Sequence, residues 1–408
     1  MLPVVRERSG QGRHAHSTGG RGAEVIRGIS AEDRFVLGCL RGYLGDLRRV
    51  ECGGLNWAEV ERKIEAQRVG GAVFQGLQRV GAASSVPTAL IGRLQADYYK
   101  TAGRVLEMTE EARRVLRAFQ ERGIEAILLK GVFLANQVYD TPGVRPMGDV
   151  DLLVRERHLP DAEAILLRLG YQQVREVMPE RWEEDLHHHL APFFNGRVGV
   201  EIHQSVAIKT HPLTAEVEGL WQRKRPVPSI APNAFALSPE DMILHLCVHC
   251  AFRWHPAKLL NLLDVAQVLR TPSEAPQWQP VLERARRLRI ERQLCFPLEL
   301  AARLLGAHVP RWVRQELTDR AKPISVEMGL TQFLALSIAR TEPILPLPLL
   351  VALAERACAV SSSKGRRLGL VKTLLFPPPE TIARLVPGTT LTLALRLLSA
   401  AARPFRAL

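Results

Sequence analysis

Carboxylates at two places in the chain have the types and spacing that a metal site requires. Asp149 and Asp151 lie two residues apart in the apolar run 149–154, and Glu201 follows later in the short apolar run 200–203. On a β-strand, residues i and i+2 point to the same face, so the two aspartates are aimed at one place. Three carboxylates brought together repel one another unless a cation lies between them. The pattern predicts a divalent metal site that could carry the phosphates of a nucleotide.

Basic and small residues close to the acidic pair are candidates for phosphate binding. Gly131 allows close approach of a backbone, and Lys130 supplies a positive charge beside it. Arg145 precedes the acidic pair and could reach phosphate oxygens, the alternative being a surface arginine paired with Asp140. An Asp-x-Asp sequence alone is more often a solvated turn. Its combination with Lys130-Gly131 and Glu201 is what favours a metal site.

Other cysteines and histidines give weaker signals. Cys247 and Cys250 have no second ligand pair at zinc spacing and fall on the apolar stripe of a predicted helix, which favours core packing. The histidine run 187–189 is predicted to be solvated. His203 beside Glu201 leaves, as a minority alternative, a transition-metal site with mixed carboxylate and imidazole ligands.

The elements that must position these residues fall into five predicted segments. Residues 1–28 are too poor in apolar side chains to fold and form a disordered basic lead-in. Residues 29–115 form an N-terminal helical region, residues 116–235 the core that carries the acidic residues, and residues 236–342 a helical domain. Residues 343–408 form a Pro-rich, basic, amphipathic C-terminal extension.

The N-terminal region shows helical periodicity. Ser30 with Asp33 predicts a capping box at a helix start, and further helices are predicted over 57–80 and 87–122. In the core, Asn195-Gly196 is a strong hairpin signal. Its predicted strands and helices alternate in short apolar runs, with strands over 124–129, 150–154, 171–177, 189–194 and 198–206 and helices over 132–139 and 160–169.

The helical domain begins at Ser238-Pro239, where Ser caps a helix and Pro starts it. Asp241, His245 and His249 form a polar stripe on that helix, for which packing is slightly favoured over a role in the site. In the C-terminal extension, residues 391–405 could lie on an anionic membrane surface, but packing on the helical domain is favoured. The predicted fold class is α+β, with a mixed sheet flanked by helical regions.

The net charge of +13 is concentrated at the ends of the 408-residue chain. Residues 1–28 carry a net charge of +3 and residues 361–408 of +7, which together account for 10 of the 13 charges. Because the body of the chain is close to balanced, the basicity is weak evidence for nucleic acid at the acidic site. A nucleic-acid partner is left open and is not required.

The distribution of the cysteines and the hydropathy of the chain bear on its cellular compartment. Six scattered cysteines argue against a disulfide framework and favour a cytoplasmic protein. No apolar stretch near the N-terminus has the character of a signal peptide. The apolar stretch 343–360 is interrupted by prolines and charges, so no transmembrane segment is predicted.

Several runs together resemble a known family. They are the stretch 128–154, with LLKG and RPMGDVDLLV, then VEIH at 200–203 and the helical stretches 238–249 and 259–269. This pattern resembles the bacterial nucleotidyltransferases of the DNA polymerase beta-like superfamily, over residues 30–340 and most specifically at 128–154. The resemblance implies a mixed-sheet core with a helical partner domain. It also implies transfer of a nucleoside monophosphate from a nucleoside triphosphate such as ATP to an acceptor hydroxyl, with Mg²⁺ or alternatively Mn²⁺.

The resemblance also assigns roles to residues. Asp149 and Asp151 would be metal ligands, and Glu201 the third carboxylate of the metal site, placed to activate the acceptor. The helical domain of the family closes over the nucleotide, so His249 and Asp264 would face the cleft. The nucleotide would contact His249 together with the residues already named at 130, 131 and 145.

The chain departs from the superfamily at one motif. A Gly-Ser pair usually begins the helix before the acidic strand and holds phosphate through backbone N–H groups and a hydroxyl. Lys130-Gly131 stands there instead, which bears on nucleotide choice more than on metal binding. Two rival functions remain: a catalytically inactive RNA-associated or membrane-surface binding protein, and a metal-dependent phosphohydrolase. The acceptor is not named by the sequence.

Overall fold

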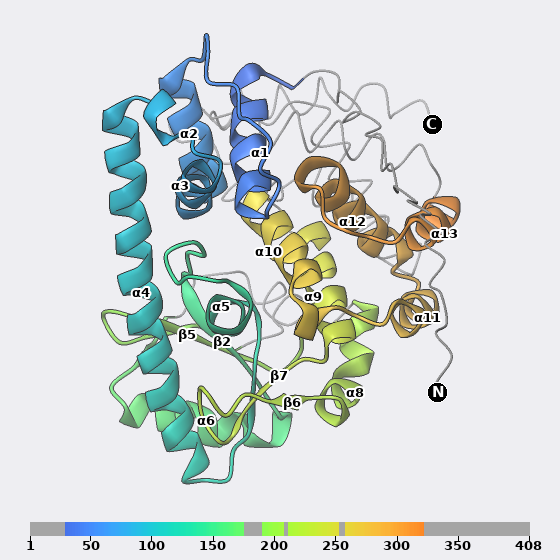
Figure 1. The fold of residues 1–408 in the computed structure, drawn as a ribbon. Helices are drawn as coiled ribbons and strands as arrows, with labels where there is room; N and C mark the ends of the chain where they lie inside the picture. Colours follow the sequence, from blue (N-terminus) through green and yellow to red (C-terminus); the bar gives the residue numbers. More distant parts are fainter. Residues whose placement is uncertain (1–28, 175–189, 208–210, 253–257, 322–408) are drawn as a thin grey trace, which may run out of the picture.

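A computed structural model of the chain describes residues 29–174, 190–207, 211–252 and 258–321. The predictions for the lead-in 1–28, the histidine run 187–189 and the extension 343–408, including its amphipathic stretch 391–405, lie outside these residues. The described part contains a mixed seven-stranded sheet flanked by helices, which confirms the predicted α+β fold class (Figure 1).

In the described residues, four α-helices and the short 3₁₀-helix η1 (Ala83–Ser85) precede the sheet. Ser30 begins the first with the predicted capping box, because its side chain accepts from the Asp33 amide and the Asp33 side chain accepts from the Ser30 amide, each at 3.1 Å. Figure 1 shows the fourth, long helix running from the other three to the sheet. The four helices are α1 (Ala31–Tyr43), α2 (Trp57–Gln67), α3 (Gly70–Arg79) and α4 (Thr88–Gln120).

The single helix predicted over 57–80 is wrong, because the chain breaks there into α2 and α3. Arg68 ends α2 in the left-handed conformation, with φ of 57°. A left-handed residue turns the backbone out of the helix, and its cost for a non-glycine residue is repaid by packing elsewhere. Val69, which is fully buried, then leads directly into α3.

The close packing of α3 on α1 depends on a glycine. A Cβ added at Gly76 would lie 1.9 Å from the carbonyl oxygen of Cys39 in α1. We expect Gly76→Ala to lower the free energy of unfolding by about 2 kcal/mol, because the two backbones must separate. Urea unfolding measures the change, with Gly92→Ala in α4 as the matched control. The space around Gly92 is open, so helix propensity should stabilise that variant by about 0.5–1 kcal/mol. Equal stability of the two variants would contradict the contact.

The sheet has the order β3-β4-β5-β2-β1-β7-β6. β1 pairs in parallel with β7 and antiparallel with β2, and β2 pairs in parallel with β5, so the sheet is mixed as predicted. The strands are β1 (Ala126–Leu128), β2 (Asp149–Val154), β3 (Gln172–Gln173), β4 (Phe193–Phe194), β5 (Gly199–His203), β6 (Arg225–Pro226) and β7 (Ala234–Ala236).

The centre of the sheet is built from apolar runs. Leu152, Leu153 and Val154 in β2 are fully buried, as expected for a strand that has neighbours on both sides and continuous apolar sequence. The predicted hairpin at Asn195-Gly196 is confirmed: Gly196 has φ of 87°, and the Asn195 side chain accepts from two following amides. β4 is shorter than the run predicted for it, and the run predicted over 171–177 is described only as far as Val174.

Shorter helices connect the strands of the sheet. Between β1 and β2, the helix predicted over 132–139 starts earlier, at Lys130, and changes to π-helix at Leu134. These connecting elements are α5 (Lys130–Phe133), η2 (Leu134–Val138), η3 (Glu156–His158), α6 (Leu159–Arg168), η4 (Pro212–Glu216) and α8 (Val217–Gln222).

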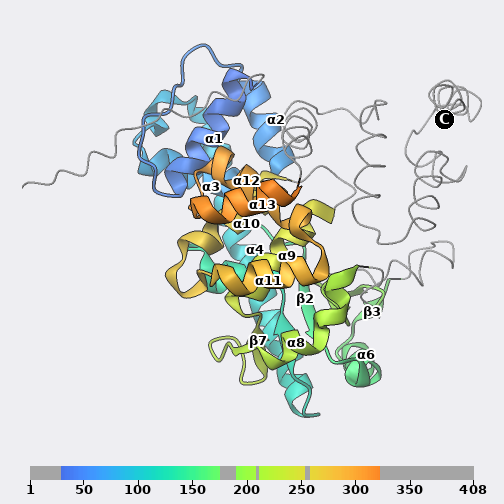
Figure 2. The ribbon, with the colours of Figure 1, turned by 90° about the vertical axis from the view of Figure 1, so that its right-hand side faces the viewer.

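The last helices of the described residues pack between the sheet and the N-terminal helices (Figure 2). They include the predicted helix that starts at Pro239 after the Ser238 cap. Arg41 of α1 donates to the carbonyls of Leu304 and Arg303 at the end of α12, which joins the two helical regions. The set is α9 (Pro239–Phe252), α10 (Leu259–Arg270), η5 (Pro272–Glu274), α11 (Trp278–Leu288), α12 (Glu291–Leu305) and α13 (Arg311–Ala321).

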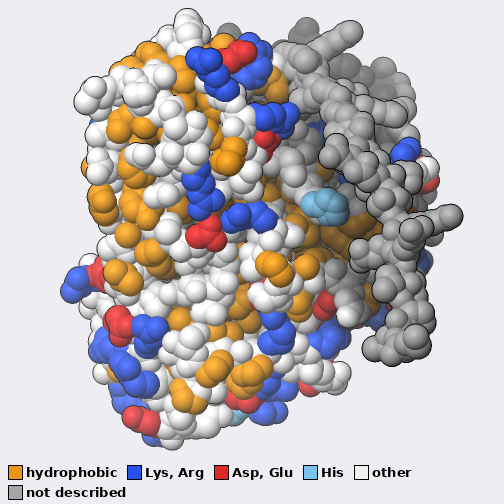
Figure 3. Space-filling model, viewed as in Figure 1, with side chains coloured by type: hydrophobic (Ala, Val, Ile, Leu, Met, Phe, Trp, Pro, Cys, Tyr) orange, Lys and Arg blue, Asp and Glu red, His pale blue; other side chains and the backbone are white. Residues whose placement is uncertain are grey.

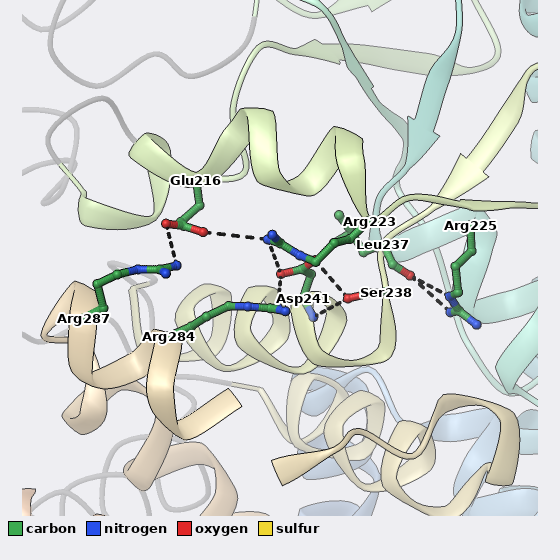
Figure 4. A network of polar contacts seen from close by, with 8 residues as sticks. All are labelled: Glu216, Arg223, Arg225, Leu237, Ser238, Asp241, Arg284 and Arg287. Carbon is green, nitrogen blue, oxygen red and sulfur yellow. Dashed lines mark hydrogen bonds and ion pairs between the residues drawn. The ribbon is translucent and has the colours of Figure 1, made fainter. Parts of the chain in front are cut away.

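A polar network joins α9 to the end of α8 and to α11 (Figure 4). Asp241, buried at the start of α9, accepts from Arg223 at 2.8 Å, from Arg284 at 2.6 Å and from the Ser238 hydroxyl at 2.9 Å. Glu216 adds an ion pair with Arg287 at 2.8 Å. Asp241 therefore serves helix packing, the favoured interpretation of its polar stripe.

The described residues show how charge is distributed on the surface and whether a helix could cross a membrane. On the face shown in Figure 3, acidic side chains lie among the basic ones instead of leaving one continuous basic surface. This agrees with a nearly balanced body of the chain. Among the described helices, none has both the length and the apolar character that a membrane crossing requires.

Candidate active site

The acidic residues predicted from the sequence lie on two neighbouring strands. β2 and β5 run in parallel with Asp151 directly opposite Glu201, and Asp149 opposite Gly199. Because side chains alternate along a strand, Asp149 and Asp151 share the face of the sheet that also carries Glu201. Gly199 has no side chain and so leaves space on this face. A Cβ added at Gly199 would lie 3.8 Å from the Asp149 Cβ. The two sequence segments are thus brought together as expected.

A group of three possible metal ligands forms at this place. One donor atom from each of Asp151, Glu201 and His203 lies within 4.8 Å of the others. His203 Nε2 is 2.9 Å from Asp151 Oδ1 and 3.5 Å from Glu201 Oε2. Asp149 is not part of this group, and its role as a ligand stays a prediction. Two carboxylates and an imidazole are donors that suit a divalent cation.

Asp149 and Asp151 have different pKa values because their surroundings differ. Burial, reinforced by the charges of Asp151 and Glu201, raises the pKa of Asp149 to about 6. Burial would also raise the pKa of Asp151, but Lys130 and the hydrogen bond with His203 outweigh it and hold that pKa well below its ordinary range. Asp151 is therefore a carboxylate at neutral pH even without a cation. Asp149 is the aspartate whose charged form its surroundings disfavour.

Lys130 and Gly131 lie beside the acidic strand. Lys130 Nζ is 3.5 Å from Asp151 Oδ2, and 18% of its side chain is exposed, so it is partly open to solvent. A Cβ at Gly131 would lie 3.4 Å from the Asp149 carbonyl oxygen and 3.3 Å from Met147 Sδ. The close approach predicted for Gly131 is thus made to the acidic strand and the loop before it. Phosphate binding by either residue stays a prediction.

Arg145 has a partner that the sequence did not indicate. Its Nε and Nη2 donate to the two oxygens of Asp264 in α10, at 3.0 and 2.9 Å, and the hydroxyl of Tyr139 donates to Asp264 at 2.7 Å. All three residues are buried. The expected alternative, a pair with Asp140, is wrong, because Asp140 pairs with Arg79 and Arg270 instead.

Arg145, Tyr139 and Asp264 form a buried triad, and its contacts bear on the prediction that Asp264 faces a cleft. Asp264 uses both oxygens inside the protein, holding the loop that leads into β2 against α10. A phosphate contact by Arg145 stays a prediction, and it would have to use donors other than the two that bind Asp264. The sequence carried one signal for the triad, a lone aspartate within the apolar helix 259–270, which requires a partner when it is buried.

Helix α9 supplies the remaining predicted residues. His249 is half-buried, and its charge helps to lower the pKa of Asp151, so it lies within electrostatic range of the acidic site. Its contact with a nucleotide stays a prediction. Cys247 and Cys250 are fully buried in the core, as favoured, and neither belongs to a metal-ligand group among the described residues.

Comparison with the sequence models of protein families identifies the family of this chain. The sequence model of a family described as "uncharacterised nucleotidyltransferase" matches residues 53–306, more than half of the chain. The chain belongs to this family. No curated protein and no solved structure matches it significantly.

Membership of the nucleotidyltransferase family fits the geometry of the site. The matched span lies inside the range 30–340 over which the sequence resembled such enzymes, and it contains β2, β5 and the helices α9 and α10 that carry His249 and Asp264. The chain therefore has a general relationship to nucleotidyl transfer. Its substrates, its metal and its residue roles are matters of proposal.

Proposed function

We propose that the protein transfers a nucleoside monophosphate from a nucleoside triphosphate to an acceptor hydroxyl, in the manner of the DNA polymerase beta-like superfamily. The observation that carries the proposal is the pairing of Asp151 with Glu201 across two central parallel strands. This register crowds carboxylates at a buried place, an arrangement that is costly unless a cation compensates it. Family membership supplies the kind of substrate.

The donor set fits the cation that such chemistry uses. Asp149, Asp151 and Glu201 would hold it, with oxygen ligands of the type that Mg²⁺ or Mn²⁺ takes. When bound, a divalent cation neutralises phosphate oxygens and favours deprotonation of the attacking hydroxyl.

The side chains around the carboxylates have separate tasks in the proposal. Lys130, held at the start of α5, offers a positive charge to the phosphates. Glu201, with 24% of its side chain exposed, is the most accessible residue of the group that it forms with Asp151 and His203, and in this proposal it would activate the acceptor. His249 of α9, whose charge helps to lower the pKa of Asp151, would contact the nucleotide.

Triphosphates labelled at the α or the γ phosphate test the function. The full chain is incubated with each label, a divalent cation and a cell extract, and the products are separated. Transfer of the α label to an extract component supports the proposal. Release of γ phosphate without a labelled acceptor would establish a phosphohydrolase, and no product with any of the four nucleotides would favour a binding protein.

Identification of the labelled product would name the acceptor class. A sugar, an antibiotic, a protein side chain and a tRNA end each offer a hydroxyl. The nearly balanced body of the chain leaves RNA open as an acceptor. Cytoplasmic localisation and the five-segment division of the chain stay predictions.

A further inference from the structure

His203 occupies a place in the site that the three-carboxylate pattern does not explain. It follows Glu201 by two residues on β5 and so lies on the same face of the sheet, one step further along the strand and opposite Leu153. Its side chain is 3% exposed, compared with 24% for Glu201. The imidazole therefore closes the inner end of the site, and the glutamate lies at the outer end.

The imidazole nitrogen is aimed between the carboxylates. Nε2 lies 2.9 Å from an oxygen of Asp151 and 3.5 Å from an oxygen of Glu201, and these three side chains form the ligand group that lies within 4.8 Å. A cation among the three would meet two oxygens and one nitrogen. The carboxylate of Asp149 lies outside this closest group.

The donor types distinguish between cations. Mg²⁺ takes oxygen ligands and demands near-ideal octahedral geometry, whereas imidazole suits first-row transition metals. Two carboxylates with phosphate oxygens keep the site rich in oxygen, which suits Mn²⁺ among those metals. We propose that His203 Nε2 is a direct metal ligand together with Asp151 and Glu201, and that this inner position takes Mn²⁺ in preference to Mg²⁺. The inference depends on the proposed function in one respect only, which is the supply of phosphate oxygens as further metal ligands.

Electron paramagnetic resonance of bound Mn²⁺ tests the ligand directly. The full chain is stripped of metal with chelator, loaded with less than one equivalent of Mn²⁺, and studied by spin-echo modulation. Coordinated imidazole produces modulation from ¹⁴N, which changes to the ¹⁵N pattern when the protein is made with ¹⁵N-histidine. Absence of nitrogen modulation from bound Mn²⁺ in the unmodified protein would overturn the inference, and this measurement needs no variant.

Calorimetric titration with each metal tests the preference. The unmodified chain is expected to bind Mn²⁺ at least about 10-fold more tightly than Mg²⁺, and His203→Gln to lose at least about 10-fold in Mn²⁺ affinity with a smaller change for Mg²⁺. His211→Asn is the matched control. His211 is a buried histidine outside the site whose ring accepts from the Leu213 amide, and Asn can replace it there as a cap.

The two proposals fail in different ways. Unchanged Mn²⁺ affinity in His203→Gln would overturn the assignment of the ligand even if α-label transfer with Mg²⁺ proceeds. Nitrogen modulation with a Mn²⁺ preference would support the ligand even if no α label is transferred. Nitrogen modulation without transfer of the α label would thus support the metal site and refute the nucleotidyltransferase proposal.

Discussion

Asp151→Asn is expected to reduce α-label transfer by at least about 10³-fold while the protein stays folded. Asp151 lies at the centre of the site, opposite Glu201 and within 3.5 Å of both Lys130 and His203. Asparagine keeps the shape and an acceptor oxygen for these neighbours but removes the charge that would hold the cation. Loss of one preorganised electrostatic group in an active site costs about 10²–10³-fold in rate, and loss of the metal adds to it.

Initial rates and thermal unfolding of the same preparations check this prediction. Glu218→Gln is the control, because Glu218 is an exposed carboxylate on α8 that pairs with Arg155 away from the site. It should transfer label at the unmodified rate. Retention of more than about one tenth of the activity in Asp151→Asn would be incompatible with Asp151 as a metal ligand.

Asp264→Asn is expected to lower the free energy of unfolding by about 3–5 kcal/mol. The carboxylate accepts two hydrogen bonds from Arg145 and one from Tyr139, and all three side chains are buried. Without the negative charge, the guanidinium of Arg145 stays buried and uncompensated, which is costlier than the loss of the hydrogen bonds alone. Urea unfolding at neutral pH measures the difference.

Asp140→Asn is the matched control for the buried triad. Asp140 also pairs with two arginines, Arg79 and Arg270, but 45% of its side chain is exposed. Ion pairs in contact with solvent contribute about 0–1 kcal/mol, so the control should lose no more than that. Pairing Asp264→Leu with Arg145→Met should recover most of the lost stability. Equal losses in Asp264→Asn and Asp140→Asn would show that the triad is not a buried ion pair of consequence.

The features that the sequence predicted are those that depend on near neighbours. The capping box at Ser30, the turn at Asn195-Gly196 and the buried run 152–154 each follow from a few adjacent residues and the backbone geometry they favour. The shared face of Asp149 and Asp151 follows from strand alternation in the same way. Local patterns thus located both strands of the candidate site.

Contacts between distant segments were the part that sequence could not supply. The register that sets Asp151 opposite Glu201 depends on how β2 and β5 pair, and either strand taken alone is compatible with other registers. The partner of Arg145 lies in α10, and the sequence named the nearer Asp140 instead. The break at Arg68 was missed because a non-glycine residue in the left-handed conformation has no local signature.

Binding of a non-hydrolysable nucleoside triphosphate, measured by calorimetry with and without divalent cation, tests the central claim most directly. If carboxylates on β2 and β5 hold a cation that bridges to a polyphosphate, the unmodified chain will bind the triphosphate with Mg²⁺ or Mn²⁺ present. Binding should weaken at least about 30-fold, or about 2 kcal/mol, both in chelator and in Asp151→Asn. Affinity that is the same with chelator, or the same in Asp151→Asn, would contradict the claim.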